Sequence, residues 1–454
     1  MLHLVGIGGA GMSGLARLAV QAGYVVSGTD REDSQVLADL RVLGVDARVG
    51  HTGDAVASGV DTLVVSTAIA PDNPELVVAT ERGIPVIHRA DLLQELMRGH
   101  RGLAVAGAHG KSTTSAMLAL ALGGASACIG ATVPGGGGTG AVWGDGPWFV
   151  AEADESDRSL LKLAPEAAIV LNVDHDHHTT YANIDEVEAV FREFVSALPP
   201  DGVLIVGPDA RARAVAAWAP CAVRVVGDVA EAFCTVTRSN GTPVLAFADG
   251  RIVSLDLAVP GAHNQSNAAC AIALAEWCGV DPAEAVRRLA PFTGVGRRFE
   301  IRGTVAGVTV VDDYAHHPVE ITATLAAART RYDGRIVVLF QPHLYSRTRA
   351  LLPEFAAALA AADRVVVTDI YGSREAFDPT ISGGDVIAAM PPGSDATFVS
   401  DLDVACDVVA AELRPGDLVL TIGAGDVTRA GQELITRLQR GQGDGGDPPA
   451  HDAP

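Results

Sequence analysis

The sequence has no long apolar run, no basic stripe and no paired cysteines, and each absence excludes a class of protein. Gly123 and Gly124 interrupt the longest apolar candidate before it reaches the roughly 18 residues of a transmembrane helix, so we expect no membrane partner. The 33 basic residues are outnumbered by 55 acidic ones, which argues against a nucleic-acid partner. The six cysteines form no C-x-x-C pair, and the amino terminus lacks the cationic region of a signal peptide. We therefore expect a cytoplasmic protein with reduced thiols.

The stretch 103–114 predicts a phosphate-binding loop. A strand candidate at residues 103–106 leads into a glycine turn at 107–110, and Lys111 opens a helix together with Ser112 and Thr113. Backbone N–H groups at such a helix start face an anion, a lysine neutralises it, and a hydroxyl can hold a metal. The strict Walker spacing lacks its first glycine here, so the alternative of an ordinary strand-to-helix turn with a chance lysine stays open at this point.

A second glycine turn follows the first strand of the chain. Residues 2–6 predict a strand, residues 6–11 read G-x-G-x-x-G, and a helix is expected over 12–22, with Asp30 following the next strand. This context predicts a nucleoside diphosphate at the helix start, either a dinucleotide or another diphosphate ligand, because the turn recognises phosphates rather than a base. His51, Ser66 and Arg89 come at or just after predicted strand ends, where ligands bind in such sheets.

Acidic residues gather after two strands that follow the phosphate loop. The strand at 148–151 ends in E-A-D-E-S-D at 152–157, and the strand at 168–173 ends in D-H-D-H-H at 174–178. So many carboxylates repel one another unless a cation neutralises them, and hard oxygen ligands favour Mg²⁺ bound with nucleotide phosphates. The alternative is that these are solvated loop acids. Further on, the segment 260–267 precedes a helix expected over 268–278, where its Asn or Ser side chains can cap the helix or face a base or ribose.

A third strand-and-helix pattern begins after the arginine pair Arg297 and Arg298. Strands are expected at 309–313, 335–340, 364–368 and 418–422, and helices at 319–330, 348–361 and 402–413. We predict an α/β protein of three domains with mostly parallel sheets, at residues 1–98, 99–302 and 303–440, followed by a disordered tail at 441–454. The first and third domains are expected to be Rossmann-like, and the central one to resemble a phosphate-loop ATPase.

Two phosphate sites on separate domains suit phosphoryl transfer between bound ligands, in which positioning and charge stabilisation matter more than a nucleophile. An NAD-dependent oxidoreductase would leave the second phosphate loop unused. A nucleotide-binding regulatory protein would leave the acid and histidine cluster unexplained.

Long motifs in a fixed order resemble those of the Mur ligase family over residues 1 to about 440. They are G-I-G-G-A-G-M-S-G at 6–14, G-x-H-G-K-S-T-T at 107–114, E-A-D-E-S-D at 152–157, H-N-x-x-N-A at 263–268, G-R-R-F at 296–299, D-D-Y-x-H-H-P at 312–318 and Q-P-H-x-Y-S-R-T at 341–348. The serine-arginine ending of the last motif resembles the ending found in the branch of the family that adds L-alanine to UDP-N-acetylmuramate. The resemblance implies that ATP phosphorylates the muramoyl carboxylate, that the amine of L-alanine attacks the acyl phosphate, and that the cofactors are ATP and Mg²⁺.

The resemblance also implies a role for each matching residue. UDP-N-acetylmuramate is bound in the first domain by Gly8, Gly9, Ala10, Gly11, Met12, Ser13, Asp30, His51, Ser66 and Arg89. ATP is bound by Gly107, Ala108, His109, Gly110, Lys111, Ser112, Thr113 and Asn267. Mg²⁺ is held by Ser112, Glu152 and His177, and L-alanine by Tyr314, His316, His343 and Arg347. The catalytic residues are Lys111, His177, Arg297, Arg298 and His316.

The chain departs from the family pattern at a few positions. Ala108 and Ser112 stand where threonine is usual, and Asp174 stands where glutamate is common. Leu344 replaces a frequent arginine, which leaves binding of the amino-acid carboxylate more dependent on Arg347. A monomer or a weak homodimer is expected.

Overall fold

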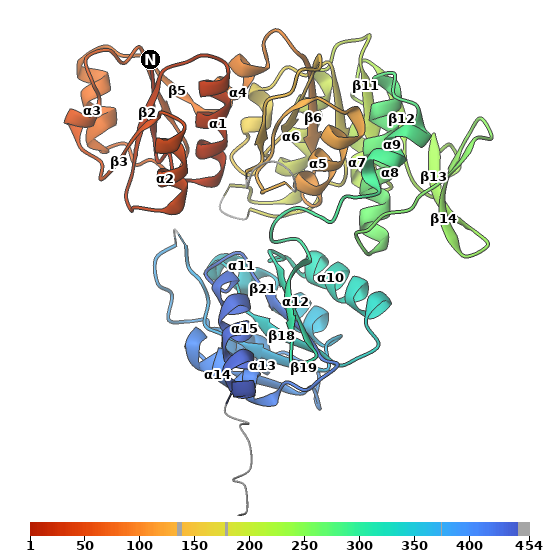
Figure 1. Ribbon diagram of the computed structural model, residues 1–454. Helices are drawn as coiled ribbons and strands as arrows, with labels where there is room; N and C mark the ends of the chain where they lie inside the picture. Colours follow the sequence, from red (N-terminus) through yellow and green to blue (C-terminus); the bar gives the residue numbers. More distant parts are fainter. Residues whose placement is uncertain (134–138, 178–179, 374, 444–454) are drawn as a thin grey trace, which may run out of the picture. The chain divides into compact units, whose positions relative to one another are not determined.

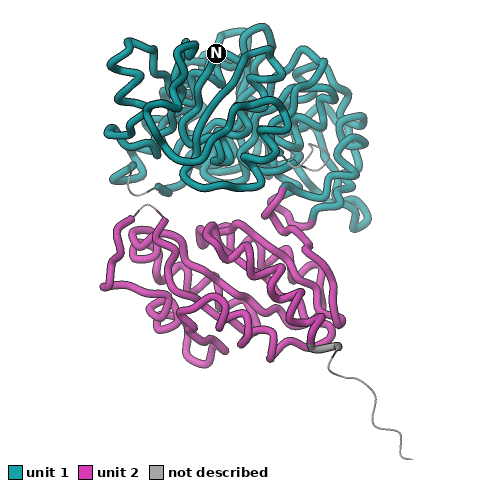
Figure 2. The backbone as a smooth tube through the Cα atoms, turned by 60° about the vertical axis from the view of Figure 1, so that its left-hand side comes forward, with its two compact units in different colours: residues 1–259, 264–295 teal, residues 260–263, 296–454 magenta. Residues whose placement is uncertain are grey.

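The computed structural model describes residues 1–133, 139–177, 180–373 and 375–443, and they form two compact units. The first unit holds Met1–Val259 and Asn264–Val295, and the second holds Pro260–His263 and the chain from Gly296 onward (Figure 2). The last helix, α15, ends at Gly443, and the remainder of the predicted tail lies outside the described residues.

The first sheet of unit 1 has five parallel strands in the order β3-β2-β1-β4-β5 (Figure 1). Apolar residues of α1, α2 and α4, such as Leu15, Leu37 and Leu92, pack in one core with Leu4 of β1, and Ala79 of α3 packs in another with Val5. Helices therefore cover both faces of the sheet. The elements are β1 (Leu2–Val5), α1 (Ala10–Gln21), β2 (Val26–Asp30), α2 (Gln35–Val42), β3 (Asp46–Val49), η1 (Gly53–Ala55), β4 (Thr62–Val65), α3 (Pro74–Glu81), β5 (Val86–His88) and α4 (Arg89–Met97).

The second sheet of unit 1 has seven strands in the order β12-β11-β10-β6-β9-β7-β8, all parallel except for the β7–β8 pair. Its central strand β6 is buried over Gly102 to Ala106 and leads directly into the predicted phosphate loop. Its elements are β6 (Arg101–Ala106), α5 (Lys111–Leu122), β7 (Ser126–Cys128), β8 (Ala141–Val142), β9 (Trp148–Glu152), η2 (Ser159–Lys162), β10 (Ala167–Val170), α6 (Ile184–Ser196), β11 (Val203–Val206), α7 (Ala210–Ala216) and β12 (Ala222–Val225).

A small antiparallel sheet and two helices follow these elements in the chain. The sheet consists of β13 (Cys234–Ser239), β14 (Thr242–Phe247) and β15 (Ile252–Ser254), and the helices are α8 (Ala262–Trp277) and α9 (Pro282–Leu289). Ile272 of α8 and Met117 of α5 pack in one core with Leu103 and Val105 of β6. On the other face of the same sheet, Phe191 of α6 packs in a core that includes alternate residues of the strands. The alternation places the two helix layers on opposite faces.

Unit 2 contains a six-stranded sheet in the order β16-β17-β21-β18-β19-β20, in which only β16 pairs in an antiparallel sense among the described strands. Two separate hydrophobic cores, one containing Phe340 and Phe355 and the other Leu339 and Leu434, show that helices cover both faces. The elements are β16 (Glu300–Val305), β17 (Val308–Asp313), α10 (Pro318–Arg331), β18 (Ile336–Phe340), α11 (Tyr345–Ala350), α12 (Leu352–Leu359), β19 (Arg364–Val367), α13 (Gly383–Ala388), β20 (Ala396–Phe398), α14 (Leu402–Glu412), β21 (Leu418–Ile422) and α15 (Thr428–Gly443).

The predicted α/β class with mostly parallel sheets is confirmed, but two predicted helices were wrong in detail. The helix expected at 268–278 already begins at Ala262, so Asn264 and Asn267 lie within its first turns and do not precede it as caps. The helix expected at 348–361 is divided into α11 and α12, because Pro353 lacks an N–H group and is accommodated in the first turn of a new helix.

All six cysteines lie among the described residues and are free thiols. No helix in the described part of the chain has the length and apolar character that a bilayer crossing needs.

Candidate active site

The predicted phosphate loop connects β6 to α5 at the carboxyl edge of the second sheet. Gly110 precedes the helix with a φ of 83°, in the left-handed region that favours glycine, and Gly107 has a φ of 144°. A Cβ atom on Gly110 would lie 3.0 Å from Oδ1 of Asn267, so the residue predicted near adenine packs directly against the loop. The first N–H groups of α5 have no carbonyl partner within the helix and are available to an anion.

Lys111 is held by the loop and by a carboxylate that was not among the predicted site residues. Its Nζ donates to the carbonyl oxygens of Gly107 at 2.8 Å and Ala108 at 3.3 Å, and it lies 3.0 and 2.8 Å from the two carboxylate oxygens of Glu155. Burial alone would lower the pKa of Lys111, but Glu155 and neighbouring acids outweigh burial and raise it. Lys111 is therefore a cation at neutral pH.

His177 reaches the same carboxylate. Its Nε2 lies 3.3 Å from Oε1 of Glu155 and 3.8 Å from Oδ2 of Asp176, and its φ of 57° is unusual for a residue with a side chain. Burial would lower the pKa of His177, but the bond to Glu155 and the charge of Asp176 raise it above its ordinary value. Glu155 thus brings together two of the predicted catalytic residues, Lys111 and His177.

Ser112 and Glu152, two of the three residues predicted to hold a metal ion, are hydrogen-bonded to each other. The Ser112 hydroxyl donates to Oε1 of Glu152 at 2.9 Å, and the N–H of Gly130 donates to Oε2 at 2.7 Å. Burial raises the pKa of Glu152, and the positive charge of Lys111, which lowers this pKa, offsets only part of the rise. A hydroxyl and a carboxylate oxygen beside a phosphate loop are the hard ligands that Mg²⁺ prefers, so these residues fit the ion.

Asn172 is a further residue of this site that the sequence predictions missed. The N–H of His109 donates to Oδ1 of Asn172 at 2.8 Å, and Nδ2 of Asn172 donates to the His109 carbonyl at 3.0 Å. The N–H of Ala108 donates to the Asn172 carbonyl at 3.3 Å. These bonds tie the phosphate loop to the end of the neighbouring strand β10. The position of Asn172 at the same sheet edge as the acidic motif was the signal that could have identified it.

The first glycine turn lies between β1 and α1. The N–H of Gly8 donates to Oδ2 of Asp30 at 2.8 Å, and a Cβ atom on Gly8 would lie 2.9 Å from that oxygen. Asp30 therefore braces the turn. Met12 is 4% exposed and belongs to the core, so its backbone rather than its side chain is available to a ligand. The Ser13 hydroxyl donates to the Ala10 carbonyl at 3.2 Å.

Arg89 lies between this turn and the acidic motif of the second sheet. Its Nη2 donates to Oδ2 of Asp154 at 2.9 Å and to Oδ2 of Asp157 at 3.0 Å. A Cβ atom on Gly11 would lie 3.7 Å from its Nη1, so the guanidinium also reaches the glycine turn. Burial would lower the pKa of Arg89, but the two carboxylates raise it. The remaining predicted residues, His51 and Ser66, follow β3 and β4 at the same sheet edge.

The predicted arginines of unit 2 lie around Tyr314. The guanidinium carbons of Arg297 and Arg298 lie 4.7 and 5.2 Å from the centre of its ring. Arg297 donates to the carbonyl of Gly423 at 2.8 Å, and Arg298 donates to Glu320 at 3.2 Å. Together these contacts hold both guanidinium groups at the carboxyl edge of the third sheet, where Arg298 pairs with Glu320 and Arg297 lies 3.6 Å from Asp312.

The other predicted residues of unit 2 continue from this group. His316 lies 5.1 Å from Tyr314 and 5.9 Å from His343, measured between ring centres, and Arg347 donates to Nδ1 of His343 at 3.1 Å. Tyr371, which was not predicted, stacks on His343 at 6.0 Å with an angle of 14° between the rings. All four residues predicted to bind the amino acid are therefore neighbours in one cluster, although they come from two motifs far apart in the chain.

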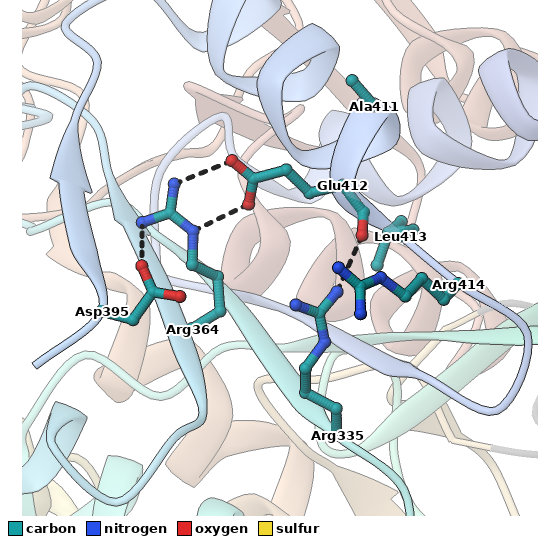
Figure 3. Close-up of a pocket in the computed structure, with 7 residues that line it drawn as sticks. All are labelled: Arg335, Arg364, Asp395, Ala411, Glu412, Leu413 and Arg414. Atoms are coloured by element: carbon teal, nitrogen blue, oxygen red, sulfur yellow. Dashed lines mark hydrogen bonds and ion pairs between the residues drawn. The ribbon is translucent and has the colours of Figure 1, made fainter.

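A pocket of about 400 Å³ in unit 2 lies at the opposite edge of the third sheet (Figure 3). Arg335 precedes β18 and Arg364 begins β19, so both mark the amino ends of the strands. Arg364 donates to both carboxylate oxygens of Glu412, at 2.8 and 3.0 Å, and lies 3.2 Å from Asp395. Its charge is neutralised within the protein, and the pocket is separate from the residues described above.

Three family models match the chain in the order of its sheets. The model described as "Mur ligase family, catalytic domain" matches residues 1–101, "Mur ligase middle domain" matches 147–275, and "Mur ligase, glutamate ligase domain" matches 297–425. The chain belongs to the Mur ligase family.

Named relatives are similar to the chain over nearly its whole length. The UDP-N-acetylmuramate–L-alanine ligase of Streptomyces coelicolor is 45% identical over 451 residues, which cover 96% of this chain and 97% of that protein. The enzyme of the same name from Kineococcus radiotolerans is 48% identical over 454 residues, with 96% of each chain covered. The crystal structure of UDP-N-acetylmuramate-alanine ligase from Thermotoga maritima superposes with a TM-score of 0.82 at 29% identity, covering 97% of this chain and 99% of that one.

Proposed function

We propose that this protein is an ATP-dependent ligase that joins L-alanine to the carboxylate of UDP-N-acetylmuramate. A carboxylate oxygen of the muramoyl group attacks the γ-phosphorus of ATP, and ADP leaves. The amine of L-alanine then attacks the carbonyl carbon of the acyl phosphate, the amide forms, and inorganic phosphate leaves with the former carboxylate oxygen. The product is UDP-N-acetylmuramoyl-L-alanine, a precursor of peptidoglycan.

The observation that carries the proposal is the arrangement around Glu155. A phosphate loop, its lysine, and the predicted histidine lie together, with Lys111 and His177 both in contact with the Glu155 carboxylate. Lys111 carries a positive charge at neutral pH and stabilises the transferring phosphoryl group, which gains charge on its oxygens in the transition state. ATP therefore binds at Gly107 to Thr113, with Asn267 beside the loop.

Mg²⁺ is the cation that the donor set suits, and it supplies charge neutralisation for the phosphate oxygens when bound. Ser112 and Glu152 would hold it, since their oxygen atoms lie 2.9 Å apart beside the loop. His177 would be the third ligand, and its Nε2 would then contact the ion in place of Glu155. The remaining acids of the motif then keep the ion's surroundings negative.

UDP-N-acetylmuramate is proposed to bind the first sheet, with its diphosphate at the start of α1. Gly8 and Gly9 lie in the turn before α1, Ala10, Gly11, Met12 and Ser13 are the first residues of the helix, and Asp30 braces the turn. Arg89 lies near the start of α1, where its positive charge would stabilise the bound diphosphate. L-Alanine is proposed to bind unit 2, where Arg347 and the rings of Tyr314, His316 and His343 form one cluster.

The domain limits are also a proposal. We place the first domain at residues 1–98, and we move the predicted boundary between the second and third domains from 302/303 to 295/296, so that β16 stays in the sheet with which it pairs. A monomer or weak homodimer acting in the cytoplasm, where ATP is available, completes the proposal.

The test follows phosphate release by the purified protein with ATP, Mg²⁺, UDP-N-acetylmuramate and one amino acid at a time. Phosphate release is expected only when all components are present, and it should be fastest with L-alanine. Glycine and L-serine are the amino acids for comparison, because Leu344 replaces an arginine that is frequent in the family. When the muramoyl carboxylate carries ¹⁸O, the released phosphate should contain one labelled oxygen. Absence of release with every amino acid would refute the ligase, and unlabelled phosphate would refute the acyl phosphate.

A further inference from the structure

A buried polar network in the first sheet includes residues to which the proposed function gives no role. Its centre is Glu75, the second residue of α3, whose side chain is fully buried. The Glu75 carboxylate lies 2.7 Å from Nε2 of His3 and 2.7 Å from Nδ1 of His51, and the Thr29 hydroxyl donates to it at 2.7 and 2.9 Å. A carboxylate in the core of a domain is costly unless it is fully hydrogen-bonded, as this one is.

The chemistry of the carboxylate fixes the protons of its neighbours. Burial would raise the pKa of Glu75, but the hydrogen bonds from His3, Thr29 and His51 outweigh burial and lower it. An ionised carboxylate can only accept hydrogen bonds, so His51 must donate through Nδ1 and His3 through Nε2. Ser27, whose Oγ lies 2.8 Å from Nδ1 of His3, closes the far end of the network.

His51 is the member of the network that reaches the surface. Its side chain is 21% exposed, whereas those of His3 and Glu75 are 1% and 0% exposed. His51 follows β3 at the carboxyl edge of the sheet, on the same edge as the glycine turn after β1. In the tautomer that carries its proton on Nδ1, Nε2 is a hydrogen-bond acceptor.

We propose that Glu75 is a positioning residue that holds His51 in the Nδ1–H tautomer, so that Nε2 accepts a hydrogen bond from the bound UDP-sugar. The inference rests on the proposed function, which places that ligand on the first sheet. The group that donates to Nε2 is a hydroxyl or the imide N–H of the uracil, because the diphosphate has no proton to donate at neutral pH. Glu75 acts through His51 and does not itself touch the ligand.

The first test is Glu75→Gln, which keeps the size of the side chain and reverses one of its hydrogen bonds. Where the NH₂ group takes the place of Oε1, Nδ1 of His51 becomes the acceptor and its proton moves to Nε2, which ¹⁵N chemical shifts of the variant report. We expect the KM for UDP-N-acetylmuramate to rise about tenfold, the effect of one lost hydrogen bond, while kcat and the KM for ATP stay within about twofold. An unchanged KM for UDP-N-acetylmuramate in a variant whose His51 carries its proton on Nε2 would overturn the proposal.

A double-mutant cycle separates this role from a general loss of stability. His51→Ala should raise the same KM by a similar factor, and adding Glu75→Gln to it should cause no further rise, because the two residues act as one unit. Fully additive effects would contradict the proposal. Ser27→Ala is the matched control: it removes a partner of His3 within the same network and should lower the melting temperature without changing the KM.

A measurement on the unmodified protein does not depend on any variant folding. ¹⁵N chemical shifts of histidine-labelled protein, assigned with His51→Gln, should show a proton on Nδ1 of His51, and a proton on Nε2 alone would overturn the proposal. Calorimetric titration with UDP-N-acetylmuramate tests the proposed function and the role of Glu75 separately. No binding by the unmodified protein would refute the proposed function, whereas equal affinity of the unmodified protein and Glu75→Gln would refute only the role of Glu75.

Discussion

Replacing Lys111 by alanine should abolish turnover and also destabilise the unit that contains it. Turnover is lost because the cation at the phosphate loop is gone. Stability falls because Glu155, whose side chain is 3% exposed, loses the ammonium group that lies 2.8 Å from its carboxylate. The second effect is visible only in the structure, since the sequence motif gives Lys111 a role toward the nucleotide alone.

The magnitude follows from the geometry of the pair. Two unit charges about 3 Å apart attract by about 6 kcal/mol at an effective dielectric constant of about 20. Breaking a buried pair by removing one partner typically costs about 3–5 kcal/mol, because the other charge stays buried. His177, with its Nε2 3.3 Å from Glu155, offsets part of this cost, so we expect about 3 kcal/mol. At about 2–4 °C per kcal/mol, the melting temperature should fall by about 6–12 °C.

Differential scanning calorimetry and phosphate release test the two effects separately. Adding Glu155→Gln to Lys111→Ala removes the uncompensated charge and should restore about 2 kcal/mol of stability without restoring turnover. Lys111→Arg, which keeps the charge, is the control for stability. A melting temperature unaffected by Lys111→Ala would refute the reasoning about the buried pair, and near-normal turnover of that variant would refute the assigned role.

Three further predictions concern the loop, the acidic motif and the amino-acid cluster. Gly110→Ala should weaken ATP binding, measured by calorimetry, at least tenfold more than Gly99→Ala, because both have a positive φ but only at Gly110 would the added Cβ meet Asn267, at 3.0 Å. Burial would raise the pKa of Asp154, but nearby cations lower it to about 2, so its stabilisation is complete above about pH 4 and is lost as the pH falls toward 2. Asp154→Asn should therefore flatten the dependence of melting temperature on pH between about 4 and 2, and an unchanged slope would contradict this. Arg347→Ala should raise the KM for L-alanine about tenfold or more while leaving the KM for ATP unchanged, and equal rises in both would contradict its assignment.

The local parts of the candidate site could be predicted because each lies within one continuous motif. The strand, turn and helix around Lys111 follow from a short apolar run, two glycines and a helix-forming segment, and the structure places α5 at Lys111–Leu122 as expected. Ser112 and Glu152 were assigned to one metal site from the resemblance of their motifs to a known family, and their oxygen atoms are 2.9 Å apart.

Partners within the cluster could not be predicted in the same way. Glu155 stood in the recognised acidic motif, but the sequence does not say which of several acids faces Lys111, because a turn of the backbone decides that. Tyr371 stacks on His343 from a segment with no motif of its own. The network of Glu75 with His3 and His51 joins residues 72 and 24 positions away in the chain, and only the packing of α3 onto the sheet makes them neighbours.

The sequence by itself determined the class of fold, the phosphate loop and the family to which the motifs belong. These depend on local patterns: apolar strands, glycines at turns, and charged residues directly after strands. The tertiary structure decided which carboxylate holds Lys111, that Arg89 joins the glycine turn to the acidic motif, and that the Glu75 carboxylate lies 2.7 Å from Nδ1 of His51. Those features depend on side chains from distant segments meeting at distances of about 3 Å, where hydrogen-bond and charge interactions become strong.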